Sequence, residues 1–432
     1  MKRVIHIKKW LLLLCLPLLS MDMAGDTGKD FFFRATLYQD WLGMKSEGGD
    51  LYQRLSGRLK LTLWNRPGNG WTVSLDMRDR YTFGELGGNQ LIIYNARLSY
   101  DHLDSKIFFS LGQMNLYDTA GIGELTGGVV GYRLGKHLSL GGYGGLEPDI
   151  YNARWDNNYI KYGLFIRYQA AGAKQISLSY NHLAFNSETE RHFLYLDLLL
   201  PLQRVLVLYG NLEYDLAGSI KSEDRLSRLF LNARLNLSRY ADITGHYSSG
   251  RGLDYHRFLL EQSQDPAIQV GEIERYYYNE VYGVRLSIKP IKSIRLFVGR
   301  QESERKDLGI RNHTTQFGLS VADILKSGIF LYGNFHLNRG DASESDSYYI
   351  SASRNFGKFS LSLNFANFYN AVRLSGEGSP QLLHYPDRRT LSANLFLILS
   401  RCLAISLDYA YSYQQEDSDH QLFVRIILRV SR

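Results

Sequence analysis

Apolar and polar residues alternate one for one in segments of about 8 to 13 residues, which recur from near residue 31 to the C-terminus. Between 54 and 63, for example, Leu55, Leu59 and Leu63 share one phase, whereas Arg54 and Arg58 share the other. Successive side chains of a strand point to opposite faces of a sheet. Each segment therefore predicts a β-strand with one apolar face and one polar face.

The connections between these segments alternate between two kinds. Ten are short and turn-like, such as 65–70, and eleven are longer and polar. The longer ones include 117–124, 249–276 and the acidic runs at 341–346 and 416–419. Counting the segments across these connections predicts about 22 antiparallel strands, with a range of 18 to 22, and no N-terminal plug domain.

One apolar face repeated over the whole length favours an all-β fold, a single transmembrane antiparallel β-barrel, over a soluble β-sandwich. Lipid cannot satisfy the backbone groups of an open sheet edge, so strands cross a membrane only as a closed barrel. The 31 Tyr, 21 Phe and 5 Trp residues agree with this, because Tyr and Trp suit the two membrane interfaces. Candidates for these aromatic girdles are Tyr162, Tyr168, Tyr180, Tyr214, Tyr282 and Tyr409.

The N-terminus has the pattern of a secretory signal peptide. Lys2, Arg3, Lys8 and Lys9 precede a short apolar run at 10–19 that is too short to span a bilayer. We therefore predict a cleaved signal at 1–24 and an outer-membrane β-barrel domain at 25–432. The net charge of the whole chain is only +7, without a block of Lys and Arg, so nucleic acid is not an expected partner.

In this pattern, residues 31–430 resemble bacterial outer-membrane β-barrel proteins of the porin and channel type. The resemblance implies location in the cell outer membrane of a Gram-negative bacterium, contact with outer-membrane lipid and lipopolysaccharide, and passage of small solutes. No family-specific motif accompanies it.

Basic side chains dominate the polar phase of the predicted strands. If the apolar phase faces lipid, the polar phase lines the pore, and rings of Arg and Lys favour anions there. An alternative interpretation is that these cations pair with acidic side chains across neighbouring strands and only stiffen the wall. The pore-lining candidates are Arg58, Lys60, Arg78, Arg80, Arg97, Arg167, Arg234, Arg285, Arg295 and Arg425.

A barrel of this size needs something that narrows its lumen, because barrels of about 16 to 18 strands already leave an aqueous channel. The longest connection, 249–276, contains an apolar Phe-Leu-Leu core and is our candidate for a constriction loop. An external loop that packs on its neighbours is the alternative. The residues that would line such a constriction are Arg251, Asp254, His256, Arg257, Phe258 and Glu261.

The sequence contains no G-x-S-x-G, H-E-x-x-H, Walker, EF-hand or C-x-x-C motif, so we expect no enzymatic activity, no cofactor and no metal. The leading hypothesis is a porin-like channel that passes small polar or anionic solutes across the outer membrane. The alternative is a structural sheath whose lumen houses a periplasmic or lumen-occupying partner, such as a cytochrome, a lipoprotein or a secreted chain.

Overall fold

A computed structural model describes most of the chain from residue 31 onward. The described residues are 31–46, 49, 51–65, 70–83, 88–102, 104–149, 154–170, 173–203, 205–216, 225–251, 278–306, 309–341, 343–374, 381–415 and 417–431. The predicted signal peptide at 1–24 lies outside them and stays a prediction.

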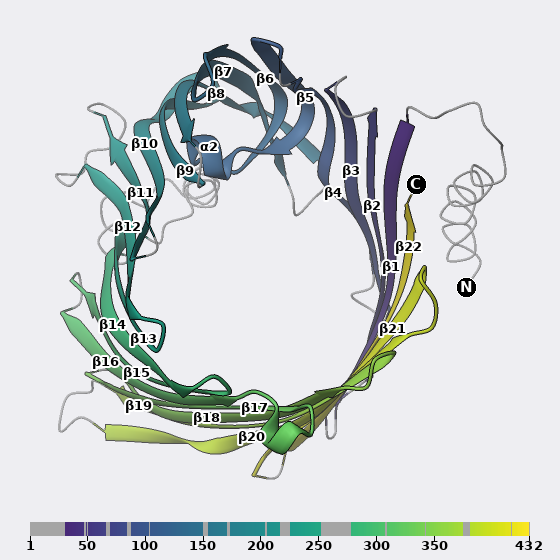
Figure 1. The fold of residues 1–432 in the computed structure, drawn as a ribbon, viewed down its shortest axis with the longest axis vertical. Helices are drawn as coiled ribbons and strands as arrows, with labels where there is room; N and C mark the ends of the chain where they lie inside the picture. Colours follow the sequence, from purple (N-terminus) through teal and green to yellow (C-terminus); the bar gives the residue numbers. More distant parts are fainter. Residues whose placement is uncertain are drawn as a thin grey trace.

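The described residues form one sheet of 22 antiparallel strands that closes on itself (Figure 1). Each strand pairs with the next, and β22 pairs with β1 from Arg34↔Ser431 to Ser46↔Asp419. The first eleven strands are β1 (Phe31–Ser46), β2 (Tyr52–Asn65), β3 (Trp71–Thr82), β4 (Asn89–Tyr100), β5 (Ile107–Asn115), β6 (Glu124–Leu134), β7 (Leu138–Asp149), β8 (Arg154–Ala170), β9 (Lys174–Phe185), β10 (Glu188–Leu202) and β11 (Leu206–Asp215).

The remaining eleven strands are β12 (Leu226–Ser238), β13 (Ala241–Arg251), β14 (Tyr278–Ile291), β15 (Ile294–Arg305), β16 (Ile310–Val321), β17 (Ile329–Gly340), β18 (Ser343–Asn355), β19 (Phe359–Leu374), β20 (Gln381–Ile398), β21 (Leu403–Gln414) and β22 (Asp417–Ser431). The predicted strand number, antiparallel order and closure are confirmed. No plug domain is evident within the described residues.

The outer face of the barrel carries the apolar phase of the strands. Leu164 is 66% exposed and Val130 57%, and similar side chains follow on nearly every strand. A water-soluble protein rarely leaves so much apolar surface uncovered, whereas lipid covers it without cost. Five of the six tyrosines predicted for the girdles are also exposed on this face: Tyr162, Tyr168, Tyr214, Tyr282 and Tyr409. No helix among the described residues is long and apolar enough to cross a membrane.

Several connections predicted to be long are short turns between strands that continue further than expected. The acidic run at 341–346 was expected in a loop, but Ser343–Asp346 begin β18, and Asp417–Asp419 begin β22. The reason is that backbone pairing continues beyond the apolar outer face. There, both faces of the strand are polar, so the alternation that identifies a strand in the sequence disappears.

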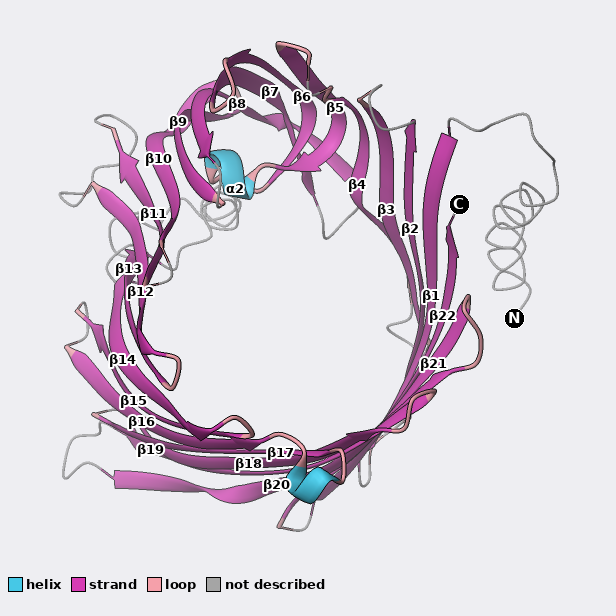
Figure 2. Cartoon of the chain, in the orientation of Figure 1, coloured by secondary structure: helices cyan, strands magenta, loops and turns pink. Residues whose placement is uncertain are grey.

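Within the described residues, two short helices lie in connections between strands, α2 (Tyr117–Ala120) and η1 (Ile324–Lys326). Figure 2 shows α2 on the inner side of the ring, beside β8 and β9, whereas η1 lies in a short connection at one end of the barrel. The position of α2 makes the inner surface of β5 to β10 different from the rest of the wall.

Candidate functional site

The segment 116–123, which connects β5 and β6, turns into the barrel instead of continuing along the wall (Figure 2). Its two ends are joined, because the Leu116 N–H donates to the Gly123 carbonyl at 2.8 Å. The Asn115 side chain accepts from the Tyr117 N–H at 2.8 Å and begins α2. Gly121 ends the helix with φ of 73°, a left-handed conformation that favours glycine. We call this segment the lumen segment.

An apolar cluster inside the barrel holds the lumen segment against the wall. Ala120 is completely buried, and Leu116 and Ile122 are nearly so. The wall contributes larger side chains from both sides of the segment: Met114, Leu125, Tyr143, Phe165, Phe193 and Tyr195. The inner wall of a water-filled barrel is normally polar, so this cluster marks a part of the lumen that is filled by protein.

Polar side chains of the wall also bind the backbone of the lumen segment. The buried Lys161 ammonium donates to the Ile122 carbonyl at 2.9 Å and pairs with Glu147 at 3.0 Å. Ser177 donates to the Thr119 carbonyl at 3.1 Å, and Arg167 donates to the Thr119 hydroxyl. A buried cation with a carboxylate and a carbonyl partner has a defined position, so these contacts set where the segment lies.

A second part of the inner wall, β22 with β1 to β4, is strongly basic. The Asp40 carboxylate accepts two hydrogen bonds from Arg425, from Nε at 2.7 Å and from Nη2 at 3.0 Å, and it lies 3.9 Å from the Arg78 guanidinium. The Asp76 carboxylate accepts two hydrogen bonds from Arg58, at 2.7 and 2.8 Å, and the Lys60 ammonium lies 3.6 Å from the same carboxylate. Each of these two carboxylates is therefore shared by two cations. We call the inner face of these five strands the basic wall.

The same arrangement recurs farther round the barrel. Arg234 and Arg295 both contact Asp242, at 3.3 and 3.2 Å. Arg285 donates to Gln316 at 2.6 Å and lies over the Phe297 ring. No carboxylate among the described residues lies within ion-pair distance of Arg80, Arg97 or Arg285.

Strand register places all ten candidate pore-lining cations on the face that carries the lumen segment. Arg167 contacts that segment directly, and antiparallel partners such as Arg58↔Arg78 and Arg234↔Thr244↔Arg285 share its face. Their role in lining a pore remains a prediction. In the ion pairs described for this part of the chain, six of the ten cations share three carboxylates, so pairing across strands and an excess of positive charge occur together.

Most of the predicted constriction loop, from 252 onward, lies outside the described residues. Asp254, His256, Arg257, Phe258 and Glu261 fall in 252–277, and Arg251 is described only as the last residue of β13. The lumen segment was not predicted to enter the barrel, since its eight residues resemble an ordinary connection. The signal that could have identified it is the apolar series Leu116, Ile122 and Leu125 between two strands.

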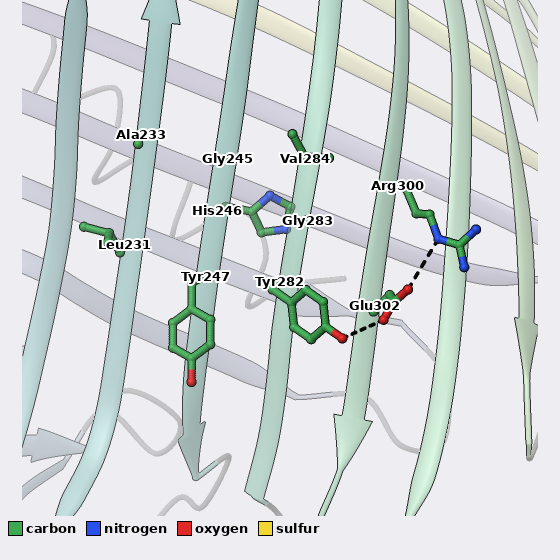
Figure 3. A pocket seen from close by; sticks show the side chains of 10 residues that line it. All are labelled: Leu231, Ala233, Gly245, His246, Tyr247, Tyr282, Gly283, Val284, Arg300 and Glu302. Carbon is green, nitrogen blue, oxygen red and sulfur yellow. Dashed lines mark hydrogen bonds and ion pairs between the residues drawn. The ribbon is translucent and has the colours of Figure 1, made fainter.

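A hollow of about 460 Å³ lies over β12 to β15 (Figure 3). Small residues, Ala233 and Gly245, form its floor. Tyr282 and Arg300 both point toward Glu302, with distances of 2.6 and 3.4 Å to its carboxylate (Figure 3). Because the surrounding face is apolar, membrane lipid would cover this hollow. The described residues contain no group of three or more His, Cys, Asp or Glu that could hold a metal ion.

No protein-family model matches the chain, and no curated protein matches its sequence. Solved structures do match. The P pilus usher (PapC) translocation pore is 10% identical, covers 92% of this chain and 99% of its own, and has a TM-score of 0.51. OccAB4 of Acinetobacter baumannii is 8% identical over 94% of this chain and 99% of its own, with a TM-score of 0.45. OpdK of Pseudomonas aeruginosa is 11% identical over 94% and 100%, with a TM-score of 0.43. The likeness shows the fold alone: a closed β-barrel of the outer-membrane type.

Proposed function

We propose that the protein is an outer-membrane channel for small polar solutes, with a preference for anions. The sharing of carboxylates is the observation that carries this proposal. Asp40, Asp76 and Asp242 each serve two cations, so pairing leaves a positive excess on the inner face. Arginine stays protonated at any physiological pH, so the excess persists in a water-filled lumen.

The lumen segment supports this proposal because charge acts only over short distances in salt solution. The Debye length is about 8 Å at physiological ionic strength, so a solute at the centre of a wide lumen is screened from the wall. A segment that fills one side of the lumen forces solutes nearer to the remaining wall. We therefore assign the lumen segment as a described element that narrows the channel, and the constriction loop predicted at 249–276 stays a prediction beside it.

Reversal potentials of the purified full chain in planar bilayers test the proposal. We expect a modest preference for chloride over potassium in a gradient of low KCl concentration, fading as salt rises because screening shortens the reach of the wall. A preference for potassium at low salt would contradict it. Complete absence of conductance, or a very large unselective conductance, would instead favour the sheath whose lumen houses a protein partner.

A further inference from the structure

The barrel wall has a weak seam between β4 and β5. Their ladder joins five residue pairs, from Ala96↔Gln113 to Tyr100↔Phe109. All other neighbouring strands of the described wall are joined by at least nine residue pairs; this smallest number occurs between β5 and β6, between β6 and β7, and between β11 and β12. The part of β4 from 89 to 95 therefore has a ladder with β3 but none with β5.

The seam begins where β5 bends away to supply the lumen segment. Gly112 has φ of 115°, and a Cβ there would clash with the Ala96 carbonyl oxygen. Beyond this glycine a side chain replaces the ladder: the Gln113 amide donates to the Ile93 carbonyl. Gln113 lies in the outward phase of β5 and is 6% exposed. A polar residue on that face is explained by its partner, since backbone groups next to lipid need a hydrogen bond.

The two sides of the seam differ in chemistry. On the lumen side, the Arg58 guanidinium lies 4.9 Å from the centre of the Tyr94 ring, and Arg97 follows on β4. The lumen-facing phase of these two strands also carries buried apolar side chains, Ile92 on β4 and Met114 on β5. On the lipid side, the same two strands expose Leu91, Leu98 and Leu111. The seam thus lies between cations in the lumen and an apolar surface in the membrane.

We propose that this seam opens as a lateral passage between the lumen and the membrane for single-chain amphiphilic anions. The anionic head group stays near Arg58 and Arg97, while the alkyl tail passes between β4 and β5 beside Ile92 and Met114. Among the hydrogen bonds described for the part of the seam beyond the ladder, a side-chain bond from Gln113 to Ile93 takes the place of backbone rungs, so opening breaks fewer backbone hydrogen bonds there than elsewhere in the wall. The proposal rests on the anion preference proposed above, because only a cationic lumen would hold the head group.

A reversible disulfide tests the passage. In a Cys402→Ser background, Asn95→Cys and Met114→Cys occupy the positions that would pair next if the ladder continued. The control pair, Leu98→Cys and Leu111→Cys, are partners within the existing ladder. The full chain is reconstituted in phospholipid vesicles, and two probes with the same head group are compared. Ethanesulfonate has no tail to place in the membrane, whereas dodecanesulfonate enters the outer leaflet and stays charged.

Passage of dodecanesulfonate is measured as the fraction that external albumin no longer extracts. We expect oxidation of the seam pair to slow it several-fold and reductant to restore it, while ethanesulfonate permeation stays constant. The control pair should change neither. Unchanged dodecanesulfonate passage in the oxidised seam variant would overturn the proposal.

Gln113→Leu provides a second test of the lateral passage, which applies even if the disulfide does not form. Removing the hydrogen bond to Ile93 should raise dodecanesulfonate passage, and an unchanged rate would again overturn the proposal. Reversal potentials of the same preparation separate the two proposals. If the unmodified protein shows no anion preference, the channel proposal is contradicted. If it prefers anions but dodecanesulfonate passage does not respond to the seam variants, the lateral passage alone is contradicted.

Discussion

Replacing Arg80 and Arg97 together by Gln should lower the anion preference of the channel. These two side chains lie on the basic wall, and no described carboxylate is within ion-pair distance of either. Their buried Nε atoms also have no hydrogen-bond partner among the described residues. The substitution therefore removes two positive charges without leaving a partner acid exposed. Gln retains hydrogen-bonding capacity and most of the bulk.

Coulomb's law gives the size of the effect. A unit charge about 8 Å from a monovalent anion in water contributes roughly 0.5 kcal/mol before screening and about 0.2 kcal/mol at 0.15 M salt. Two charges amount to about 0.4 kcal/mol, or roughly a twofold change in anion permeability, with an opposite change of the same size for a monovalent cation. At 0.01 M salt the Debye length is about 30 Å, and the same change rises to roughly fourfold. Near 1 M salt it should vanish.

The assay is the reversal potential across a KCl gradient, repeated at low, physiological and high salt. Arg300→Gln is the control, because Arg300 is 59% exposed on the outer face and the substitution removes one positive charge there, half the change made in the lumen. The reasoning would be refuted if the double variant kept its reversal potential at 0.01 M salt. It would also be refuted if Arg300→Gln shifted the potential equally, since the change would then reflect total charge and not the lumen.

Three further outcomes are expected. Replacing 117–122 by Gly-Gly should raise single-channel conductance more than deletion of 253–269 does. A larger rise in the deletion variant would indicate that the connection at 249–276 is the main constriction. Gly121→Val places a Cβ about 2.5 Å from the Tyr195 ring, so it should displace the lumen segment and raise conductance without changing the strand content seen by circular dichroism. If the ends with longer connections face outward, Ser343→Cys should react with an impermeant maleimide in intact cells. The exposed native Cys402, in a short connection, should react only after the outer membrane is permeabilised.

The barrel itself was predictable because lipid imposes a strict rule on every strand. The outward positions of β2 must be apolar and its inward positions may be polar, so Leu55, Leu59 and Leu63 against Arg54 and Arg58 determine both the strand and its faces. The rule applies independently to each strand, which is why the strand count did not depend on any long-range contact. The requirement for apolar outward positions ends at the edge of the lipid. The acidic start of β18 lies beyond that edge, so its sequence predicted a loop.

The lumen segment was not predictable in this way because its position depends on contacts between distant strands. The apolar cluster joins Met114 to Phe193 and Tyr195, and the aromatic rings need space that glycines provide. A Cβ on Gly131 would clash with the Phe108 ring. Gly131 belongs to a glycine-rich run at 121–145, which from the sequence alone indicates only that strands bend or pack closely. Its additional role, leaving room for a core inside the barrel, becomes visible only when the register is known.

A single bend in β5 produces both the lumen segment and the weak seam, and a substitution at that bend should reveal the link. Gly112→Ala adds a methyl group against the Ala96 carbonyl oxygen and also strains a residue with φ of 115°. Gly135→Ala is the matched control: it has φ of 82° in a turn, and nothing lies within 4 Å of the added methyl group.

The backbone strain common to both variants costs about 1 to 3 kcal/mol, so both should unfold at lower temperature in detergent. Only Gly112→Ala should also disturb the start of the lumen segment and the seam, because only there does the methyl group press on β4. We expect it alone to raise channel conductance and dodecanesulfonate passage together. If one of these rises without the other, the constriction and the seam are independent features of the wall.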